Sequence, residues 1–212
     1  MCKMKTIIGL IGPKTCGKST IAEHIVNKYS CSEVVIATKL KETCSEVFKI
    51  PIDHFSNQKI KEIPFISPIN FDIIQARKIL DAFKLPYESI TSINKELTSP
   101  RHILQYIGTD FLRKVGGDDI HCNTLSLDDN FTVVSDIRLI SEFDYFNNNV
   151  YINFIPLYIK RNTLEDVVDN HVSETEFIEL IDKAIEIDNT NSLSSTFKQI
   201  DNVIQNNWFC IS

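Results

Sequence analysis

The segment KTIIGLI at 5–11 leads directly into GPKTCGKS at 12–19, and together these two segments decide the fold. The first is an apolar run of strand length, and the second is a loop that begins with Gly12 and carries a second glycine, Gly17. From Thr20 to Tyr29 apolar residues recur at helical spacing, which predicts a helix that opens directly from the loop. A strand, a glycine-bounded loop and a helix in this order are the expected context of a phosphate-binding P-loop, or Walker A motif.

Each fixed position of this loop has a physical reason. Gly12 and Gly17 allow the backbone to curl so that successive N–H groups point at phosphate oxygens, and the dipole of the following helix adds positive potential. We expect Lys18 to reach the β- and γ-phosphates of ATP and the hydroxyl of Ser19 to ligate Mg²⁺. The rest of the ATP-binding set predicted here consists of Lys14, Thr15, Cys16 and Thr20, with Lys14 balanced between a phosphate contact and solvent-exposed surface.

Length and composition narrow the class of protein. A chain of 212 residues fits one domain, or one domain with an inserted lid, and can bury a sizeable core. The net charge of −6 offers no basic stripe for a phosphate backbone, so we expect no nucleic-acid partner. The six cysteines show neither a Cys-x-x-Cys pair nor a matching His spacing, which favours reduced thiols without a disulfide frame or zinc site.

The apolar segments are short. The longest, at 150–159, is interrupted by Asn153 and Pro156, and the N-terminal run of about seven residues is too short for an export signal. We therefore expect a cytoplasmic protein without a membrane partner. The oligomeric state stays open, with a homodimer as one option.

Apolar periodicity predicts alternating strands and helices along the chain. Besides the first strand, buried strands are expected at 33–37, 131–135, within 150–159 and at 184–187. Helices are expected at 40–48, 71–83, from 99 to the glycines at 116–117, and at 118–127, 139–146, 174–181 and 192–203. This alternation predicts an α/β protein with the three-layer P-loop NTPase fold and a parallel central sheet. Prolines break the pattern between 51 and 68, so we expect a substrate-binding insertion at about 51–98, and a polar lid at about 160–172.

The tripeptide Asp136-Ile-Arg138 follows the predicted strand 131–135. Both charged side chains should therefore emerge at the carboxyl edge of the sheet, where open α/β folds bind ligands. We expect Asp136 to hold Mg²⁺ through water and Arg138 to clamp a phosphate. The alternative for Asp136 is a plain helix cap.

Arginine is scarce, with five residues against seventeen lysines. Since its planar fork grips phosphate in a way that lysine cannot, each arginine at a strand end or in a lid is a candidate. Arg113 and Arg161 are the stronger candidates, and Arg101 is balanced between a substrate contact and solvated surface. Arg77 is expected on an exposed helix face.

The sequence offers no convincing nucleophile with an adjacent base. This fits phosphoryl transfer to another phosphate, because a monophosphate has a second pKa of about 6 and is already an anionic nucleophile at neutral pH. The protein then has to position the reactants and neutralise their charge.

Five segments together resemble the deoxynucleoside monophosphate kinases of bacteriophages and other large DNA viruses. They are GPKTCGKST at 12–20, ATKLK at 37–41, RHILQYIGTD at 101–110 with Arg113, VSDIR at 134–138, and HVSE at 171–174 with IDN at 187–189. The segment LQYIGTD is the most discriminating, because P-loops occur in many unrelated activities. The resemblance implies a single P-loop kinase domain over 1–212 that transfers the ATP γ-phosphoryl to a deoxynucleoside monophosphate, giving the diphosphate and ADP. It also implies a role in deoxynucleotide biosynthesis and, for a viral protein, a place in the host cytoplasm.

The resemblance assigns roles to individual positions. Lys18 and Ser19 match the phosphate and magnesium positions, and Arg161 matches the lid arginine. The positions around the acceptor and transferred phosphates are matched by Lys41, Arg113, Asp136 and Arg138. Further members of the implied site are Arg101, Gln105, Thr109 and Asp110 on the acceptor side and Asn189 on the ATP side.

The chain also departs from the family. It lacks a proline before Leu40, and Ile120 stands where an aromatic residue is common. Animal-type phosphomevalonate kinase is the nearest rival, since it is similar around the P-loop, the Leu-Lys segment and VSDIR, but it lacks a good counterpart of LQYIGTD. A nucleotide-binding module without turnover is the remaining alternative.

Overall fold

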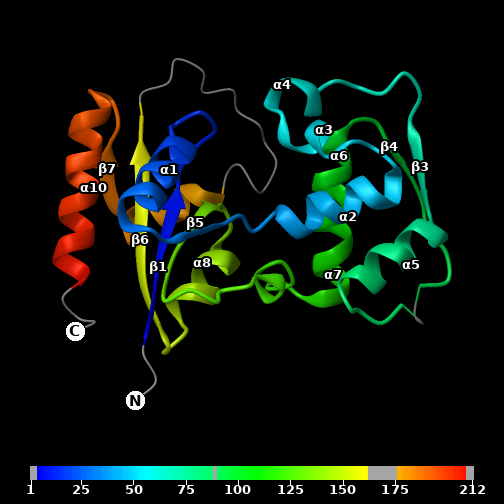
Figure 1. Ribbon diagram of the computed structural model, residues 1–212. Helices are drawn as coiled ribbons and strands as arrows, with labels where there is room; N and C mark the ends of the chain where they lie inside the picture. The colour runs from blue at the N-terminus through cyan, green and yellow to red at the C-terminus, as the bar shows by residue number, and fades with distance from the viewer. Residues whose placement is uncertain (1–3, 88–89, 162–175, 209–212) are drawn as a thin grey trace. The chain divides into compact units, whose positions relative to one another are not determined.

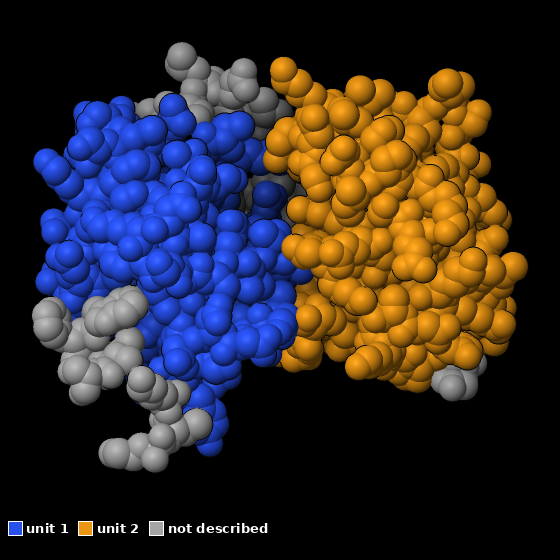
Figure 2. Space-filling view, viewed as in Figure 1, with its two compact units in different colours: residues 1–36, 125–212 blue, residues 37–124 orange. Residues whose placement is uncertain are grey.

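The computed structural model describes residues 4–87, 90–161 and 176–208 and divides into two compact units. Figure 2 colours unit 1, residues 1–36 and 125–212, in blue, and unit 2, residues 37–124, in orange. The expected insertion at 51–98 falls inside unit 2, whereas 162–172 of the expected lid lie outside the described residues. No helix in the described part of the chain is both long and apolar enough to cross a bilayer.

Unit 1 is organised around a five-stranded parallel sheet with the strand order β2-β5-β1-β6-β7. Its strands are β1 (Lys5–Ile11), β2 (Ser32–Val34), β5 (Phe131–Ile137), β6 (Ile152–Lys160) and β7 (Ile185–Asp188). Because β1 is central, the loop that follows it begins at the middle of the sheet's carboxyl edge, between the ends of β5 and β6. The predicted α/β class with a parallel central sheet is confirmed.

Helices cover both faces of this sheet and give three layers (Figure 1). On one face, α1 (Lys18–Tyr29) and α10 (Leu193–Trp208) share an apolar cluster with β1. Members of this cluster include Ile8, Leu10, Ile21, Ile25, Ile200 and Ile204. On the other face, the ring of Phe154 in β6 packs against Phe143 and Phe146 of α8 (Ile140–Asn147), and the 3₁₀ helix η3 (Glu176–Lys183) lies against α8.

Unit 2 has a separate apolar core, built mainly from helices. Its first helices are α2 (Thr38–Phe48), α3 (Ile52–Ser56), α4 (Gln58–Lys61) and α5 (Ile73–Ala82). Strands β3 (Ile69–Asp72) and β4 (Asn94–Leu97) pair antiparallel. A single helical run then consists of α6 (Pro100–Gln105), the π-helical segment η1 (Tyr106–Leu112) and α7 (Arg113–Gly116), and the short 3₁₀ helix η2 (Cys122–Thr124) follows.

The start and end of this long helix confirm the sequence prediction. The hydroxyl of Ser99 accepts a hydrogen bond from the backbone N–H of His102 at 3.1 Å, and Pro100 occupies the first helical position. At the other end, Gly117 adopts a left-handed φ of 83°.

Three of the predicted elements are wrong in detail here, and one strand was not predicted. The second strand is not buried at 33–37 but lies at 32–34 on the sheet edge, where it has one neighbouring strand and Glu33 is exposed. The helix predicted at 71–83 begins only at Ile73, since the carboxylate of Asp72 caps it and 69–72 is strand. The strand at 94–97 was not predicted, because three of its four residues are exposed and show no alternation. Only 122–124 of the predicted helix 118–127 is helical, since the segment begins as a turn in which the Ile120 N–H bonds to the carbonyl of Gly117, three residues back.

Candidate functional site

The loop at 12–19 has the backbone shape that its glycines predict. Its φ angles are 146° at Gly12, 61° at Thr15 and 102° at Gly17, all in the region that favours glycine. A Cβ atom at Gly17 would lie 2.5 Å from Nδ2 of Asn189, and one at Gly12 would lie 2.9 Å from the carbonyl oxygen of Ile159. Both positions therefore require glycine, for conformation as well as for space.

The ammonium of Lys18 lies over this loop. Its Nζ donates to the carbonyl oxygens of Gly12 at 2.6 Å and Pro13 at 2.7 Å. The Sγ atom of Cys16 lies 3.7 Å from the same nitrogen and is fully buried. A cation is thus held at the mouth of a glycine loop that opens into a helix N-terminus, and all three features favour an anion.

Two buried side chains that contact each other, which we call the loop brace, support the backbone of the loop. The brace consists of Asn189, 5 % exposed, and Thr196, 0 % exposed. Nδ2 of Asn189 donates to the carbonyl of Cys16 at 2.8 Å, and the hydroxyl of Thr196 lies 2.9 Å from Oδ1 of Asn189. The resemblance gave Asn189 a place in the ATP site, and its carboxamide is engaged at both ends by the protein itself.

The Asp136-Ile-Arg138 segment lies beside the loop, because Ile137 of β5 pairs with Ile11 at the end of β1. The prediction that it follows the strand is wrong by two residues: β5 runs to Ile137, and a register shift next to Gly9 and Ile11 accommodates the extra residue. Oδ1 of Asp136 accepts a hydrogen bond of 2.7 Å from the backbone N–H of Ile36.

Two backbone N–H groups just before α8 are bound by the side chain of another residue. Oε2 of Glu142, a side chain that is 7 % exposed, accepts from the backbone N–H of Arg138 at 2.9 Å and of Leu139 at 3.1 Å. Glu142 was not predicted as a site residue, although a glutamate in the first turn of a helix is a known capping signal. It fixes the backbone from which the side chain of Arg138 extends.

Two oxygen groups in unit 1 suit Mg²⁺. They are the exposed hydroxyl of Ser19 in the first turn of α1 and the partly buried carboxylate of Asp136. Mg²⁺ commonly takes one or two protein oxygens and completes its shell with water and phosphate, so this donor set fits. Elsewhere among the described residues, no group of three His, Cys, Asp or Glu side chains could hold a metal.

The remaining predicted residues of unit 1 lie around the loop. Lys14 is half-buried within it, Thr15 is exposed, and Thr20 is exposed at the start of α1. Arg161 is exposed directly after β6. The predicted capping motif at 171–174 lies outside the described residues.

Six of the predicted acceptor residues lie in unit 2, whereas Asp136 and Arg138 lie in unit 1. Four of them recur at every fourth position of the long helix: Arg101, Gln105, Thr109 and Arg113. Asp110 is exposed on the same helix, and Lys41 is half-buried on α2.

Both arginines of this helix have carboxylates nearby. Nη1 of Arg101 lies 3.3 Å from Oε1 of Glu62, and Nη1 of Arg113 lies 3.9 Å from Oδ1 of Asp118. The two arginine side chains are only 12 % and 11 % exposed. Glu62 and Asp118 were not predicted, because nothing in the local sequence marks them as partners.

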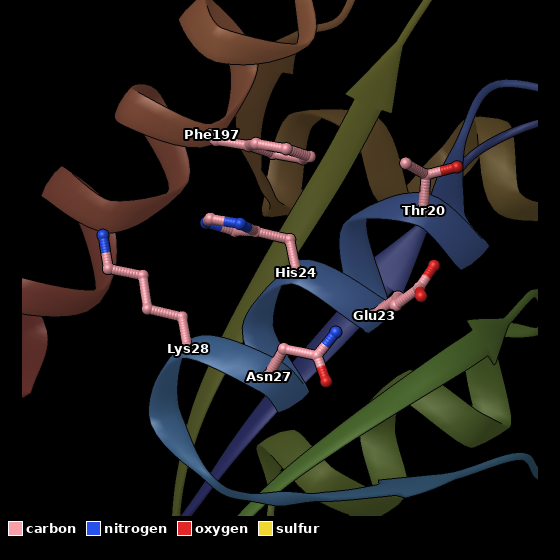
Figure 3. Close-up of a pocket in the computed structure, with 6 residues that line it drawn as sticks. All are labelled: Thr20, Glu23, His24, Asn27, Lys28 and Phe197. Atoms are coloured by element: carbon pink, nitrogen blue, oxygen red, sulfur yellow. The ribbon is translucent and has the colours of Figure 1, made fainter.

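A groove of about 410 Å³ runs along the outer side of α1, the helix that opens from the loop. Its lining residues are Thr20, Glu23, His24, Asn27, Lys28 and Phe197. Figure 3 shows the ring of Phe197 from α10 face to face with that of His24 from α1, with centroids 3.9 Å apart and planes at 3°.

Beside this ring pair, Asp201 of α10 fastens the two helices. Its carboxylate lies 3.2 Å from Nε2 of His24 and accepts from Lys28 Nζ at 2.6 Å and from the Tyr29 hydroxyl at 2.9 Å. Burial raises the pKa of Asp201, but the hydrogen bonds from these three groups outweigh it, so the net pKa is lowered. Burial, followed by the bond to Asp201, raises the pKa of Tyr29. This cluster was not predicted, since 172 residues separate Tyr29 from Asp201.

Comparison with known proteins gives a partial match. No protein-family model matches the chain. Over 108 residues, which are 50 % of this chain, the sequence is 28 % identical to a protein of Acanthamoeba polyphaga mimivirus named "Putative deoxynucleotide monophosphate kinase". The matched residues cover 42 % of that viral protein, so the chain spans less than half of its length.

Proposed function

We propose that this protein transfers the γ-phosphoryl group of ATP to a deoxynucleoside monophosphate and releases the deoxynucleoside diphosphate and ADP. The observation that carries the proposal is the ammonium of Lys18, held by the carbonyls of Gly12 and Pro13 at the mouth of the glycine loop. The similarity to a viral protein named as a nucleotide kinase supports the same reaction class.

On the donor side, the backbone N–H groups of the loop and the N-terminus of α1 bind the phosphates of ATP. Lys18 exchanges its bonds to the two carbonyls for bonds to the β- and γ-phosphates, which keeps it charged and hydrogen-bonded throughout. Arg138, at the end of the neighbouring strand, neutralises charge that develops on the transferred group. The loop backbone is held by Asn189 before the nucleotide binds, so Lys18 is the group of the loop that has to exchange its bonds.

Magnesium fits the same site. Ser19 would ligate it directly and Asp136 through water, and the bound ion would neutralise charge on the donor phosphates. The hydrogen bond from the Ile36 N–H holds Oδ1 of Asp136, which fixes the direction of the carboxylate.

On the acceptor side, we assign the monophosphate to the unit 2 residues that the family resemblance implies. Arg113 lies 3.9 Å from Asp118; the side chain of Arg113 is 11 % exposed, whereas that of Asp118 is 77 % exposed. The distance is long for an ion pair and the carboxylate is solvated, so a dianionic phosphate can compete with it for the guanidinium. Lys41 and Arg101 supply further positive charge, and Gln105 and Thr109 supply hydrogen bonds to the nucleoside. Arg161 is retained as the lid arginine.

A coupled assay of ADP formation tests the proposal. Purified protein with ATP and Mg²⁺ is offered dTMP, dGMP, dCMP and dAMP, their ribose counterparts and phosphomevalonate, each at several concentrations. We expect ADP formation to depend on at least one deoxynucleoside monophosphate, with the matching diphosphate identified by chromatography. Turnover with phosphomevalonate alone would move the protein to the rival activity, and ATP binding without turnover on any acceptor would make it a binding module.

A further inference from the structure

The long helix of unit 2 changes its hydrogen-bonding pattern in the middle. Residues 100–105 and 113–116 are α-helical, whereas Tyr106–Leu112 is π-helical. The π-segment contains most of the LQYIGTD motif. π-helical segments are rare, usually a single turn, and frequent at functional sites, so one of this length needs a cause.

The π-segment changes which side chains share a side of the helix. In a continuous α-helix each residue advances by about 100°, so Arg113 would lie about 120° around the axis from Arg101. A π insertion adds one residue to a turn, so the twelve residues from Arg101 to Arg113 rotate around the helix axis only as far as about eleven α-helical residues would. The angle between the two arginines around the axis therefore falls to about 20°. The insertion thus aligns the two arginines along one side of the helix.

One buried side chain holds this segment from outside the helix. Nε2 of His121 lies 2.9 Å from the carbonyl oxygen of Gly108, in the middle of the π-segment, and the ring is 6 % exposed. The ring also meets the ring of Phe83 edge to face, at a centroid distance of 5.9 Å.

Gly108 is enclosed from a second direction. A Cβ atom there would lie 2.7 Å from Cδ2 of Leu40 and 3.6 Å from Nε2 of His121. The backbone at Gly108 therefore lies between a leucine of α2 and the histidine, with no space for a side chain. Packing, rather than a backbone angle that only glycine adopts, therefore explains why the LQYIGTD motif has a glycine at position 108.

The loop that carries His121 reaches the helix at a second point. It begins with Gly117 and places Asp118 at 3.9 Å from the guanidinium of Arg113. The same short loop thus contacts the π-segment at the Gly108 carbonyl and the following turn at Arg113.

We propose that His121 is a positioning residue for the acceptor site. By donating to the Gly108 carbonyl it stabilises the π-helical register, and this register turns Arg113 to the side of the helix that carries Arg101, the side that we assign to the acceptor. This role rests on the proposed function for its substrate, but the hydrogen bond and the register do not depend on it.

Three variants test this role. His121→Phe keeps the ring against Phe83 but removes the donor, and His121→Gln retains an N–H at a similar distance from the backbone. His54→Phe, which changes a histidine of unit 2 outside the long helix, is the matched control. For His121→Phe we expect the KM of the deoxynucleoside monophosphate to rise about tenfold and the KM of ATP to stay within about twofold. His121→Gln should recover most of the loss, and His54→Phe should match the wild type.

Hydrogen exchange separates this role from general support of the fold. In His121→Phe the amides of 106–112 should exchange at least about tenfold faster, while those of the unit 1 sheet keep their wild-type rates. Equal increases in both KM values, or unchanged exchange at 106–112, would overturn the proposal.

If His121→Phe does not fold, the ¹⁵N spectrum of wild-type histidines decides, because Nε2 of His121 must carry a proton. A deprotonated Nε2 would refute the proposal. If the wild type has no kinase activity, the proposed function fails, and the exchange rates still decide the role of His121.

Discussion

Replacing Asn189 by alanine should weaken both the fold and the binding of ATP. The variant removes the Nδ2 donor of the carbonyl of Cys16, which lies 2.8 Å away, and the acceptor that lies 2.9 Å from the hydroxyl of Thr196. Since Asn189 is 5 % exposed, water does not easily replace either bond. A buried polar group left without its partner costs about 1–3 kcal/mol, so we expect the free energy of unfolding to fall by about 2 kcal/mol.

The effect on binding follows from where the bond acts. Cys16 lies inside the loop whose N–H groups should hold the phosphates, so the variant loosens the bound shape of the loop. If the whole loss of about 2 kcal/mol destabilises the ATP-binding conformation of the loop, the affinity for ATP falls about 30-fold, because about 1.4 kcal/mol corresponds to a factor of ten. This value is an upper limit, because part of the loss is shared with the rest of the fold.

Urea unfolding followed by circular dichroism measures the first effect, and titration calorimetry with ATP and Mg²⁺ measures the second. Asn191→Ala is the matched control, because this exposed asparagine two positions along the chain bonds only weakly to Asp188 and Thr190, at 3.2 and 3.4 Å. It should stay within about 0.5 kcal/mol of the wild type. A cycle with Thr196→Val should give a coupling of about 0.5–3 kcal/mol, since the two side chains are in contact. The reasoning fails if Asn189→Ala behaves like Asn191→Ala in both measurements.

Three further predictions follow from the same site. Lys18→Ala and Arg138→Ala should each lower kcat about 10²-fold or more in the coupled assay, the scale of a lost electrostatic clamp, and near-normal turnover would reject the assigned role. Gly17→Ala should weaken ATP binding at least about tenfold by calorimetry, because its methyl would lie 2.5 Å from the amide of the loop brace at a φ of 102°; wild-type affinity would contradict the loop geometry. Asp201→Asn should lower the free energy of unfolding by about 1.5–3 kcal/mol at pH 7. Because folding lowers the pKa of Asp201, its charge stabilises the fold above the unfolded pKa of about 4, and this stabilisation is lost as the pH falls below that value. The urea unfolding curves of the wild type and the variant should therefore converge in acid. A difference in stability that persists in acid would refute the charge argument.

The sequence could predict the loop and the sheet because both depend on local rules. Gly12, Gly17 and Lys18 each have a fixed purpose at a fixed spacing, and a parallel sheet needs only apolar runs that alternate with helices. The same local rules do not predict the contacts that support the loop. The bond from Asn189 to Cys16 joins residues 173 positions apart, and neither residue type marks its partner.

The π-segment escaped prediction for another reason. Its apolar residues Ile107, Phe111 and Leu112 are also compatible with α-helical spacing, so periodicity alone predicts a plain helix. Only the contacts of Gly108, with Leu40 on one side and His121 on the other, distinguish the two registers. The LQYIGTD motif overlaps this segment, while the geometry of the segment depends on residues outside the motif.

Two residues of α10, Thr196 and Asp201, support α1 and its loop through separate sets of contacts. Loss of each set should have a different consequence. Thr196 acts through Asn189 on Cys16 within the loop, whereas Asp201 acts on His24, Lys28 and Tyr29, beyond the first turn of α1. Groups that stabilise developing charge are effective when they are fixed in advance, so only the contact through Asn189 should affect the proposed phosphate binding directly. Loss of Asp201 should therefore destabilise the fold with ATP affinity nearly unchanged, while loss of Asn189 should change both. If both variants lowered the affinity in proportion to stability, α10 would act on the loop only through the overall fold.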